Sequence, residues 1–196
     1  MRLTLEDLVN DPALLTTQLV TGAGAPFTAR LLLATDVEAL GRYFDGLGPA
    51  VRGVYGPHPL NADHAVVLCT ELDYNHLLPF LAFDGETIVG YFLVQIGVRE
   101  GDRQRYIDHG QPLVEKQCCT LAPCVADAWQ QRGLGSALFP HVAESLRRLG
   151  RQRLVLWGGV RGDNPRAQHF YRKFGFQHVG TFMVRDLDNL DMVLDL

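Results

Sequence analysis

The chain has 196 residues, of which 47% are hydrophobic and 20% are charged, and its formal net charge is −4. These values are typical of one globular domain with a sizeable core, and they exclude an intrinsically disordered chain. The negative charge, with no run of Lys and Arg among aromatic residues, excludes an ordinary nucleic-acid partner. No apolar stretch is long enough to span a membrane and the N-terminus lacks a signal-peptide core, so we expect a cytoplasmic protein without membrane contact.

The first half of the chain is predicted to hold a short extension, three helices and a hairpin. We treat residues 1–26 as an N-terminal extension with a helix at 5–19, and residues 27–196 as a single domain. The next predicted elements are a strand at 28–33, helices at 36–47 and 62–72, and a β-hairpin with strands at 77–83 and 87–96. Residues 97–116 are polar and are predicted to be irregular, and loops of this length in compact domains usually have a function.

The second half alternates between strands and helices. The predicted elements are a strand at 117–125, a helix at 134–149, a strand at 153–157, a helix at 165–174, and two terminal strands at 177–186 and 190–196, with their turn around Asp188 and Asn189. The pattern predicts an α/β fold with a mixed sheet.

The cysteine and histidine residues show no metal-ligand spacing, so no metal site is predicted. The four cysteines are Cys69, Cys118, Cys119 and Cys124. Reduced, buried thiols are the expected state for such residues.

Residues 130–136, Gln-Gln-Arg-Gly-Leu-Gly-Ser, lie between a predicted strand and a predicted helix. Gly133 and Gly135 leave neighbouring backbone N–H groups unobstructed, and the helix start adds its own free donors and the positive end of its dipole. Such a loop can hold a pyrophosphate. A dinucleotide fingerprint would need a third Gly where this chain has Leu138, and no Gly-Lys-Ser/Thr follows for a P-loop.

A second motif covers residues 164–176. Asp163 or Asn164 can cap a helix whose first residue is Pro165. The apolar face of this helix consists of Ala167, Phe170, Tyr171 and Phe174, and Gly175 can end it.

Taken together, Q-x-x-G-x-G at 130–135 and N-x-x-A-x-x-F-Y-x-x-F-G-F at 164–176 resemble the GCN5-related N-acetyltransferases, the GNAT superfamily. The resemblance covers about residues 28–196. It implies a GNAT-like mixed, mostly antiparallel β-sheet flanked by helices, and acetyl-CoA as the cosubstrate. Residues 43–49, 55–59, 73–74 and 125–130 are similar to the GNAT domains of bacterial protein acetyltransferases. Either a small-molecule amine or a protein lysine is therefore a candidate acceptor.

The resemblance also implies which residues hold the cofactor and move protons. The cofactor-binding candidates are Cys124, Val125, Ala126, Gln130, Gln131, Arg132, Gly133, Leu134, Gly135, Ser136, Asn164, Ala167, Phe170, Tyr171 and Lys173. Among them the backbone of 124–126 would pair with pantetheine and polarise the thioester carbonyl. Tyr171 matches the position whose phenol protonates the leaving thiolate, so it is the predicted general acid.

The general base is harder to assign. The bacterial branch has a Glu ten positions before the motif Gln, and this chain has Thr120 there. Glu71 and Glu115 are the catalytic carboxylate candidates, with Asp73, Asp108 and His109 as further groups and a water relay as the remaining route.

Two functions remain open from the sequence. One is an acetyl-CoA-dependent N-acetyltransferase in which a primary amine attacks the thioester directly in a ternary complex. The other is a non-catalytic CoA-binding sensor or scaffold module. By analogy, exposed terminal strands are compatible with a homodimer.

Overall fold

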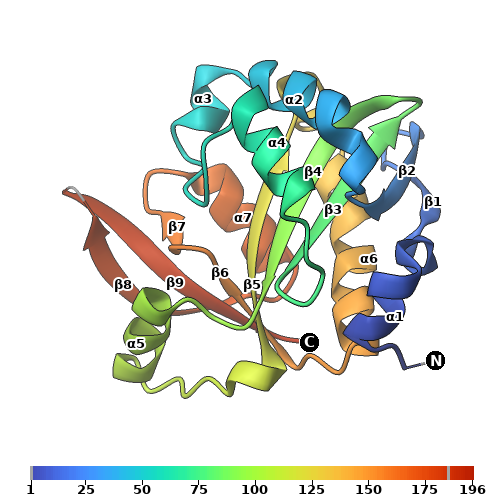
Figure 1. Cartoon of the computed structure of the whole chain (residues 1–196). Coiled ribbons are helices and arrows are strands. Elements are labelled where there is room, and N and C mark those ends of the chain that lie inside the picture. The colour runs from blue at the N-terminus through green and yellow to red at the C-terminus, as the bar shows by residue number, and fades with distance from the viewer. Residues whose placement is uncertain (1, 185) are drawn as a thin grey trace.

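The computed structural model describes residues 2–184 and 186–196 and shows one mixed sheet with helices on both faces (Figure 1). The strands are β1 (Thr17–Val20), β2 (Pro26–Leu31), β3 (Leu77–Asp84), β4 (Thr87–Ile96), β5 (Cys118–Val125), β6 (Arg153–Leu156), β7 (Val160–Arg161), β8 (Gln177–Val184) and β9 (Leu187–Asp195). Their order is β1-β2-β3-β4-β5-β6-β9-β7, with β8 on β9. The β5–β6 pair is parallel and the others are antiparallel, which confirms the predicted fold class.

The α-helices divide between the two faces of this sheet. They are α1 (Leu5–Asn10), α2 (Val37–Asp45), α3 (Pro49–Arg52), α4 (Ala62–Thr70), α5 (Glu100–Asp108), α6 (Leu134–Arg148) and α7 (Pro165–Lys173). Side chains of α6 and α7 share a core with one face of the sheet, which includes Leu121 of β5. Side chains of α2 and α4 share a second core with the opposite face, which includes Ala122 and Cys124. Because successive strand residues point to opposite faces, neighbouring residues of β5 belong to different cores.

The N-terminal residues are integrated into the domain. Leu3, Leu8 and Leu15 are buried in the α6 core, and β1 is the first strand of the sheet, paired with β2. The predicted helix at 5–19 is wrong beyond Asn10. Asp11 caps a separate 3₁₀ turn that begins at Pro12, and the chain then enters β1.

The prediction that residues 97–116 are irregular is wrong, because this segment contains α5. This helix carries few apolar residues, so it lacks the amphipathic pattern that reveals helices in a sequence. Tyr106, with Val98 and Leu113 beside the helix, forms a third core with Cys118, Val155 and Val193. Those strand residues alternate with members of the α6 core, so α5 covers the same face as α2 and α4. Figure 1 shows α5 near the β8–β9 hairpin, apart from α3 and α4.

The terminal hairpin exists, but its predicted turn is misplaced. Asp188 and Asn189 lie inside β9, paired with Met183 and Phe182. The chain reverses before them, near Asp186, whose φ is +62°. The predicted first strand, 177–186, also includes residue 185, which lies outside the described residues.

Candidate active site

The site begins where β5 and β6 separate. The two strands pair from Cys118 to Leu121, and the last bond in this direction runs from Trp157 N to Leu121 O, at 3.0 Å. Beyond this bond β5 continues to Val125, whereas the segment that follows β6 turns away through Gly158 and Gly159, with φ of +63° and +70°. No strand among the described residues pairs with the end of β5 on this side.

The register of β5 determines which backbone groups face this gap. Ala126 N donates to Val89 O at 3.0 Å, so the Ala126 N–H and the backbone groups of Cys124 point toward β4, while the Ala126 carbonyl accepts from Trp129 N and Gln130 N. Those of Pro123 and Val125 point to the gap. Proline has no N–H to offer, and an unpaired edge is where a strand tolerates it. Val125 therefore supplies the N–H on the open edge, while its carbonyl accepts from Gln130 Nε2 at 3.1 Å.

The predicted loop begins close to this edge and leads into α6. Gln131 and Gly133 have positive φ, +60° and +83°, and Gly133 immediately precedes the helix. The N–H groups of residues 131–133 donate to no acceptor among the described residues. Leu134, Gly135 and Ser136 are the first residues of α6, so their N–H groups have no acceptor within the helix. Six successive N–H groups are thus available to an anion.

Cations surround this loop. Arg132 is exposed, Arg166 Nη1 donates to Gln130 Oε1 at 2.5 Å, and Lys173 Nζ donates to Ser136 Oγ at 3.0 Å. The loop therefore combines free backbone donors with positive side chains, which suits a phosphate group.

The backbone at position 135 lies close to α7. A Cβ added at Gly135 would be in ordinary van der Waals contact with Phe170 Cε2, at 3.4 Å. The Phe170 ring is itself held between Phe92 and Phe139, at centroid distances of 6.3 and 5.8 Å. The start of α6 and the middle of α7 thus pack closely, which brings the two sequence motifs together.

Helix α7 begins as predicted, with Asn164 Oδ1 accepting from Ala167 N at 3.1 Å. Tyr171 lies on the buried face of this helix, with Phe176 at a centroid distance of 5.2 Å. The Tyr171 hydroxyl forms no hydrogen bond with any described residue. It is nevertheless not fully buried, because Arg151 Nε is the one fully buried side-chain nitrogen or oxygen without a hydrogen-bond partner in the described part of the chain. The Tyr171 hydroxyl therefore reaches solvent. Burial raises the pKa of Tyr171, so the phenol keeps its proton.

The opposite face at the same strand position carries a network that the sequence did not reveal. Tyr43 donates its hydroxyl to Cys124 O at 3.0 Å, and Tyr91 is the cross-strand neighbour of Cys124. His58 Nε2 lies 3.0 Å from the Tyr91 hydroxyl and 3.1 Å from that of Tyr55. In the sequence, residues 55–59 indicate only a similarity to the GNAT domains of bacterial protein acetyltransferases. No residue near His58 in the sequence predicts its contact with Tyr91.

The pKa values of two groups in this network differ strongly from their ordinary values. Burial lowers the pKa of His58 to about 4 and raises that of the Cys124 thiol to about 11. His58 is therefore neutral at physiological pH, and Cys124 is a protonated thiol. Direct attack by an amine suits such a site better than an acyl-cysteine intermediate, because the thiolate is the nucleophilic form.

The two carboxylate candidates lie in different places. Glu115 Oε1 accepts from Val98 N at 3.1 Å, and its other oxygen lies 3.8 Å from Arg103 Nη1. It precedes β5, and the length of that strand, about 24 Å at roughly 3.4 Å per residue, separates it from Val125. Glu71 is exposed at the end of α4, on the Cys124 face. The two candidates therefore have different surroundings, and no hydrogen bond or ion pair among the described residues joins them.

Two described cavities lie away from the loop. One of about 700 Å³ lies between the start of α2 and the β3–β4 turn, and its lining includes Arg30 and Phe83. A neighbouring one of about 410 Å³ is lined by Tyr43, Ile88 and Ala126 among others. Neither is lined by Tyr171 or by residues 130–136.

The helices of the described residues are all too short or too polar to cross a membrane. Within the same residues, no group of three or more His, Cys, Asp or Glu side chains is arranged to hold a metal ion.

Comparison with solved structures finds several similar folds. The GNAT domain of S. lividans PAT is 21% identical, with a TM-score of 0.75, and the match covers 94% of this chain and 99% of that one. YncA from Salmonella typhimurium, a putative acetyltransferase solved with its cofactor acetyl-CoA, is 18% identical, with a TM-score of 0.63 and coverage of 86% and 93%. Mycobacterium smegmatis RimJ, in complex with CoA-disulfide, is 15% identical, with a TM-score of 0.65 and coverage of 92% and 86%.

No curated protein sequence matches the chain significantly. The model of the acetyltransferase (GNAT) family matches residues 51–176, which include β5, the 130–136 loop, α6 and α7. This match and the shared fold confirm the predicted resemblance, and they support acetyl-CoA-dependent acetyl transfer as the general activity. The chain belongs to the acetyltransferase (GNAT) family.

Proposed function

We propose that this chain transfers the acetyl group of acetyl-CoA to a primary amine, on a small molecule or a protein lysine, by direct attack in a ternary complex. The observation that carries the proposal is the gap between β5 and β6, which opens beside the free donors of residues 131–136. An extended pantetheine arm needs such an unpaired strand edge, and the pyrophosphate needs such a cradle.

Binding would involve residues of both motifs. Backbone N–H groups of residues 131–136 would hold the pyrophosphate, with Arg132 and Lys173 as nearby cations. The pantetheine arm would lie along the unpaired edge of β5, with its thioester end at Val125. Asn164, Ala167 and Phe170 would line the other side of the arm, with the Asn164 side chain also serving as the helix cap. Acetyl-CoA, when bound, supplies the activated acyl group.

Transfer requires one bond to form, one to break and two protons to move. Val125 N–H would donate to the thioester oxygen and stabilise its developing negative charge. The amine nitrogen bonds to the acyl carbon, the C–S bond breaks, and the Tyr171 hydroxyl gives its proton to the departing thiolate. The surroundings that raise the pKa of Tyr171 would also raise that of a thiol beside it, so the proton transfer remains accessible.

The amine must lose its own proton to a base. Of the two carboxylates, Glu71 is the better candidate, because it is exposed on the Cys124 face. Glu115 is engaged by Val98 and Arg103 near the start of β5. Water can carry the proton from the amine to Glu71, since the amine needs to lose only one proton.

Replacing Tyr171 with Phe tests this assignment. We expect the kcat to fall by about 10²-fold or more, the usual contribution of a general acid, with the Kd for CoA nearly unchanged. Tyr74→Phe is the matched control, because it also removes a buried hydroxyl, one that donates to Leu32 O at 2.5 Å. An unchanged kcat in folded Tyr171→Phe would contradict the acid role. If the wild type bound CoA but acetylated no amine in a broad panel, the CoA-binding module would be the better reading.

A further inference from the structure

Helix α5 occupies an unusual position in the chain. Strands β4 and β5 are antiparallel neighbours, with Ile96 paired to Cys119, so a tight turn would suffice to join them. The chain instead makes an excursion that contains α5 and packs it on the face that also carries Cys124. An insertion of this size needs a structural or functional reason.

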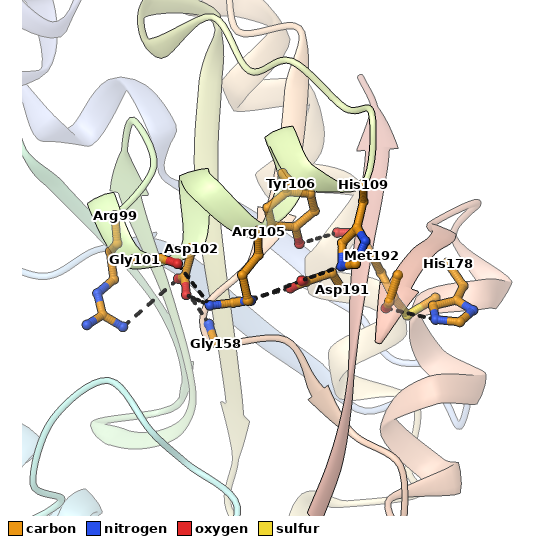
Figure 2. Close-up of polar contacts among 11 residues, drawn as sticks. Arg99, Gly101, Asp102, Arg105, Tyr106, His109, Gly158, His178, Asp191 and Met192 are labelled. Carbon is orange, nitrogen blue, oxygen red and sulfur yellow. Dashed lines mark hydrogen bonds and ion pairs between the residues drawn. The ribbon is translucent and has the colours of Figure 1, made fainter. Parts of the chain in front are cut away.

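An ionic cluster anchors this helix (Figure 2). Arg105 binds Asp191 of β9 through two hydrogen bonds of 3.0 Å, and Asp102 through one of 2.9 Å. The side chains of Asp191 and Asp102 are 0% and 4% exposed. His109 Nε2 lies 3.7 Å from Asp191, and the Arg105 guanidinium lies 3.7 Å from the Phe182 ring centroid.

The same helix contacts the turn that forms one side of the β5–β6 gap. Asp102 Oδ2 accepts a hydrogen bond from Gly158 N at 3.2 Å, and Arg99 Cζ lies 5.1 Å from the Trp157 ring centroid. Trp157 makes the last bond to β5, and Gly158 and Gly159 then turn away with positive φ. Helix α5 therefore contacts the chain at the point where the gap opens.

Anchoring α5 by an ion pair does not by itself explain why a carboxylate is buried at position 102. Burying an ion pair usually gains no stability over apolar residues of similar size, so apolar side chains would anchor α5 equally well. A carboxylate adds a directional acceptor for a backbone N–H. Gly158 needs such a partner, since glycine is conformationally free and an added Cβ at this position would meet no atom within 4 Å.

We propose that Asp102, held in place by Arg105, is a positioning residue for acetyl transfer, because it fixes the turn at 157–159 and so the shape of the gap. This inference rests on the proposed function, which places the thioester in that gap. The 130–136 loop leads into α6 and forms no hydrogen bond with α5 among the described residues, so Asp102 should affect the chemical step more than cofactor affinity.

The test compares Asp102→Ala and Asp102→Asn with Asp36→Ala. Asp36 is a close match for Asp102, because it also pairs with an arginine, Arg30, and accepts a backbone N–H, that of Leu33 at 2.7 Å. It lies at the start of α2, away from the β5–β6 gap. The readouts are hydrogen exchange at the Gly158 amide, the Kd for CoA by calorimetry, and the kcat and KM with acetyl-CoA and an amine.

For Asp102→Ala we expect exchange at Gly158 to quicken about tenfold, because a hydrogen bond is lost. The kcat should fall about 10- to 100-fold while the Kd for CoA changes less than about threefold, since misplacement by an ångström is enough to slow chemistry. Asp102→Asn keeps an oxygen acceptor and should recover most of the kcat. Unchanged exchange and kcat in Asp102→Ala, or an equal loss of kcat in Asp36→Ala, would overturn the proposal.

A triple variant covers the case in which Asp102→Ala does not fold. Asp102→Leu, Arg105→Met and Asp191→Leu together replace the ionic cluster by apolar side chains, a change that proteins usually tolerate. Reduced kcat with retained CoA binding would support the positioning role, and wild-type kcat would refute it. If the wild type acetylated no amine, exchange at Gly158 would still decide whether Asp102 holds the turn.

Discussion

The protonation state of His58 leads to a quantitative prediction. Its Nδ1 lies 2.8 Å from Pro59 O and must carry the hydrogen, so Nε2 is the acceptor for the tyrosine hydroxyls. Burial lowers the pKa of this ring to about 4 from the ordinary 6.5, and His64, stacked at a centroid distance of 4.3 Å, contributes in the same direction. The folded protein therefore resists protonation of His58.

The sign of the pH effect follows from these two pKa values. Between pH 6.5 and pH 4 the unfolded chain binds a proton that the folded chain does not, so the free energy of unfolding falls as the pH falls. At pH 5 the full shift would be worth about 2 kcal/mol, and partial exposure of the ring reduces this to about 1 kcal/mol. Below pH 4 this contribution becomes constant.

The assay compares the Tm of the wild type and of His58→Gln at pH 7 and pH 5. Glutamine offers an oxygen acceptor and does not titrate in this range. We expect the wild type to lose about 2–4 °C more than the variant between the two pH values, the shift that about 1 kcal/mol causes in a domain of this size. His64 and His141, whose pKa values are also lowered, are present in both proteins. Equal losses of Tm would refute the reasoning.

Three further substitutions probe other parts of the structure. Gly133 has a φ of +83°, and a Cβ added there would lie 3.1 Å from Gly22 N, so we expect Gly133→Ala to lower the free energy of unfolding by about 1 kcal/mol and to weaken CoA binding at least about tenfold. Gly85→Ala, at a φ of +57° in the β3–β4 turn, is the control and should leave the Kd for CoA unchanged. Equal Kd values in both would contradict the cradle. Gly180→Ala would place a Cβ 2.1 Å from the His109 ring, and we expect a loss of about 1–3 kcal/mol in urea unfolding that His109→Ala relieves. A loss that persists without His109 would show that the two do not interact. Thr120→Glu should destabilise the fold by several kcal/mol without raising activity, because it buries a carboxylate, and a more active variant would show that this position serves the amine.

The parts of the fold that follow from local signals were predictable. Gly133 and Asn164 mark the starts of α6 and α7 because a positive φ and a side-chain cap are properties of single residues in their own segments. The β3–β4 hairpin was likewise visible, because Gly85 adopts a positive φ between two apolar runs.

What could not be predicted depends on contacts distant in the sequence. Helix α5 is anchored by Arg105 on Asp191, and the His58 network needs Tyr91, and neither partner is suggested by its neighbours in sequence. The sequence pattern also could not show that Val125, and not Cys124 or Ala126, directs its backbone to the gap, because this depends on which β5 residues bond to β4.

The absence of an acid at position 120 and the presence of α5 are connected. Thr120 is fully buried, and its hydroxyl donates to Gly97 O at 2.9 Å. Gly97 is the first residue of the excursion that carries α5, so the segment that covers Thr120 is the same one that brings Asp102 to Gly158. A chain that covers this position cannot use it to take a proton from an incoming amine.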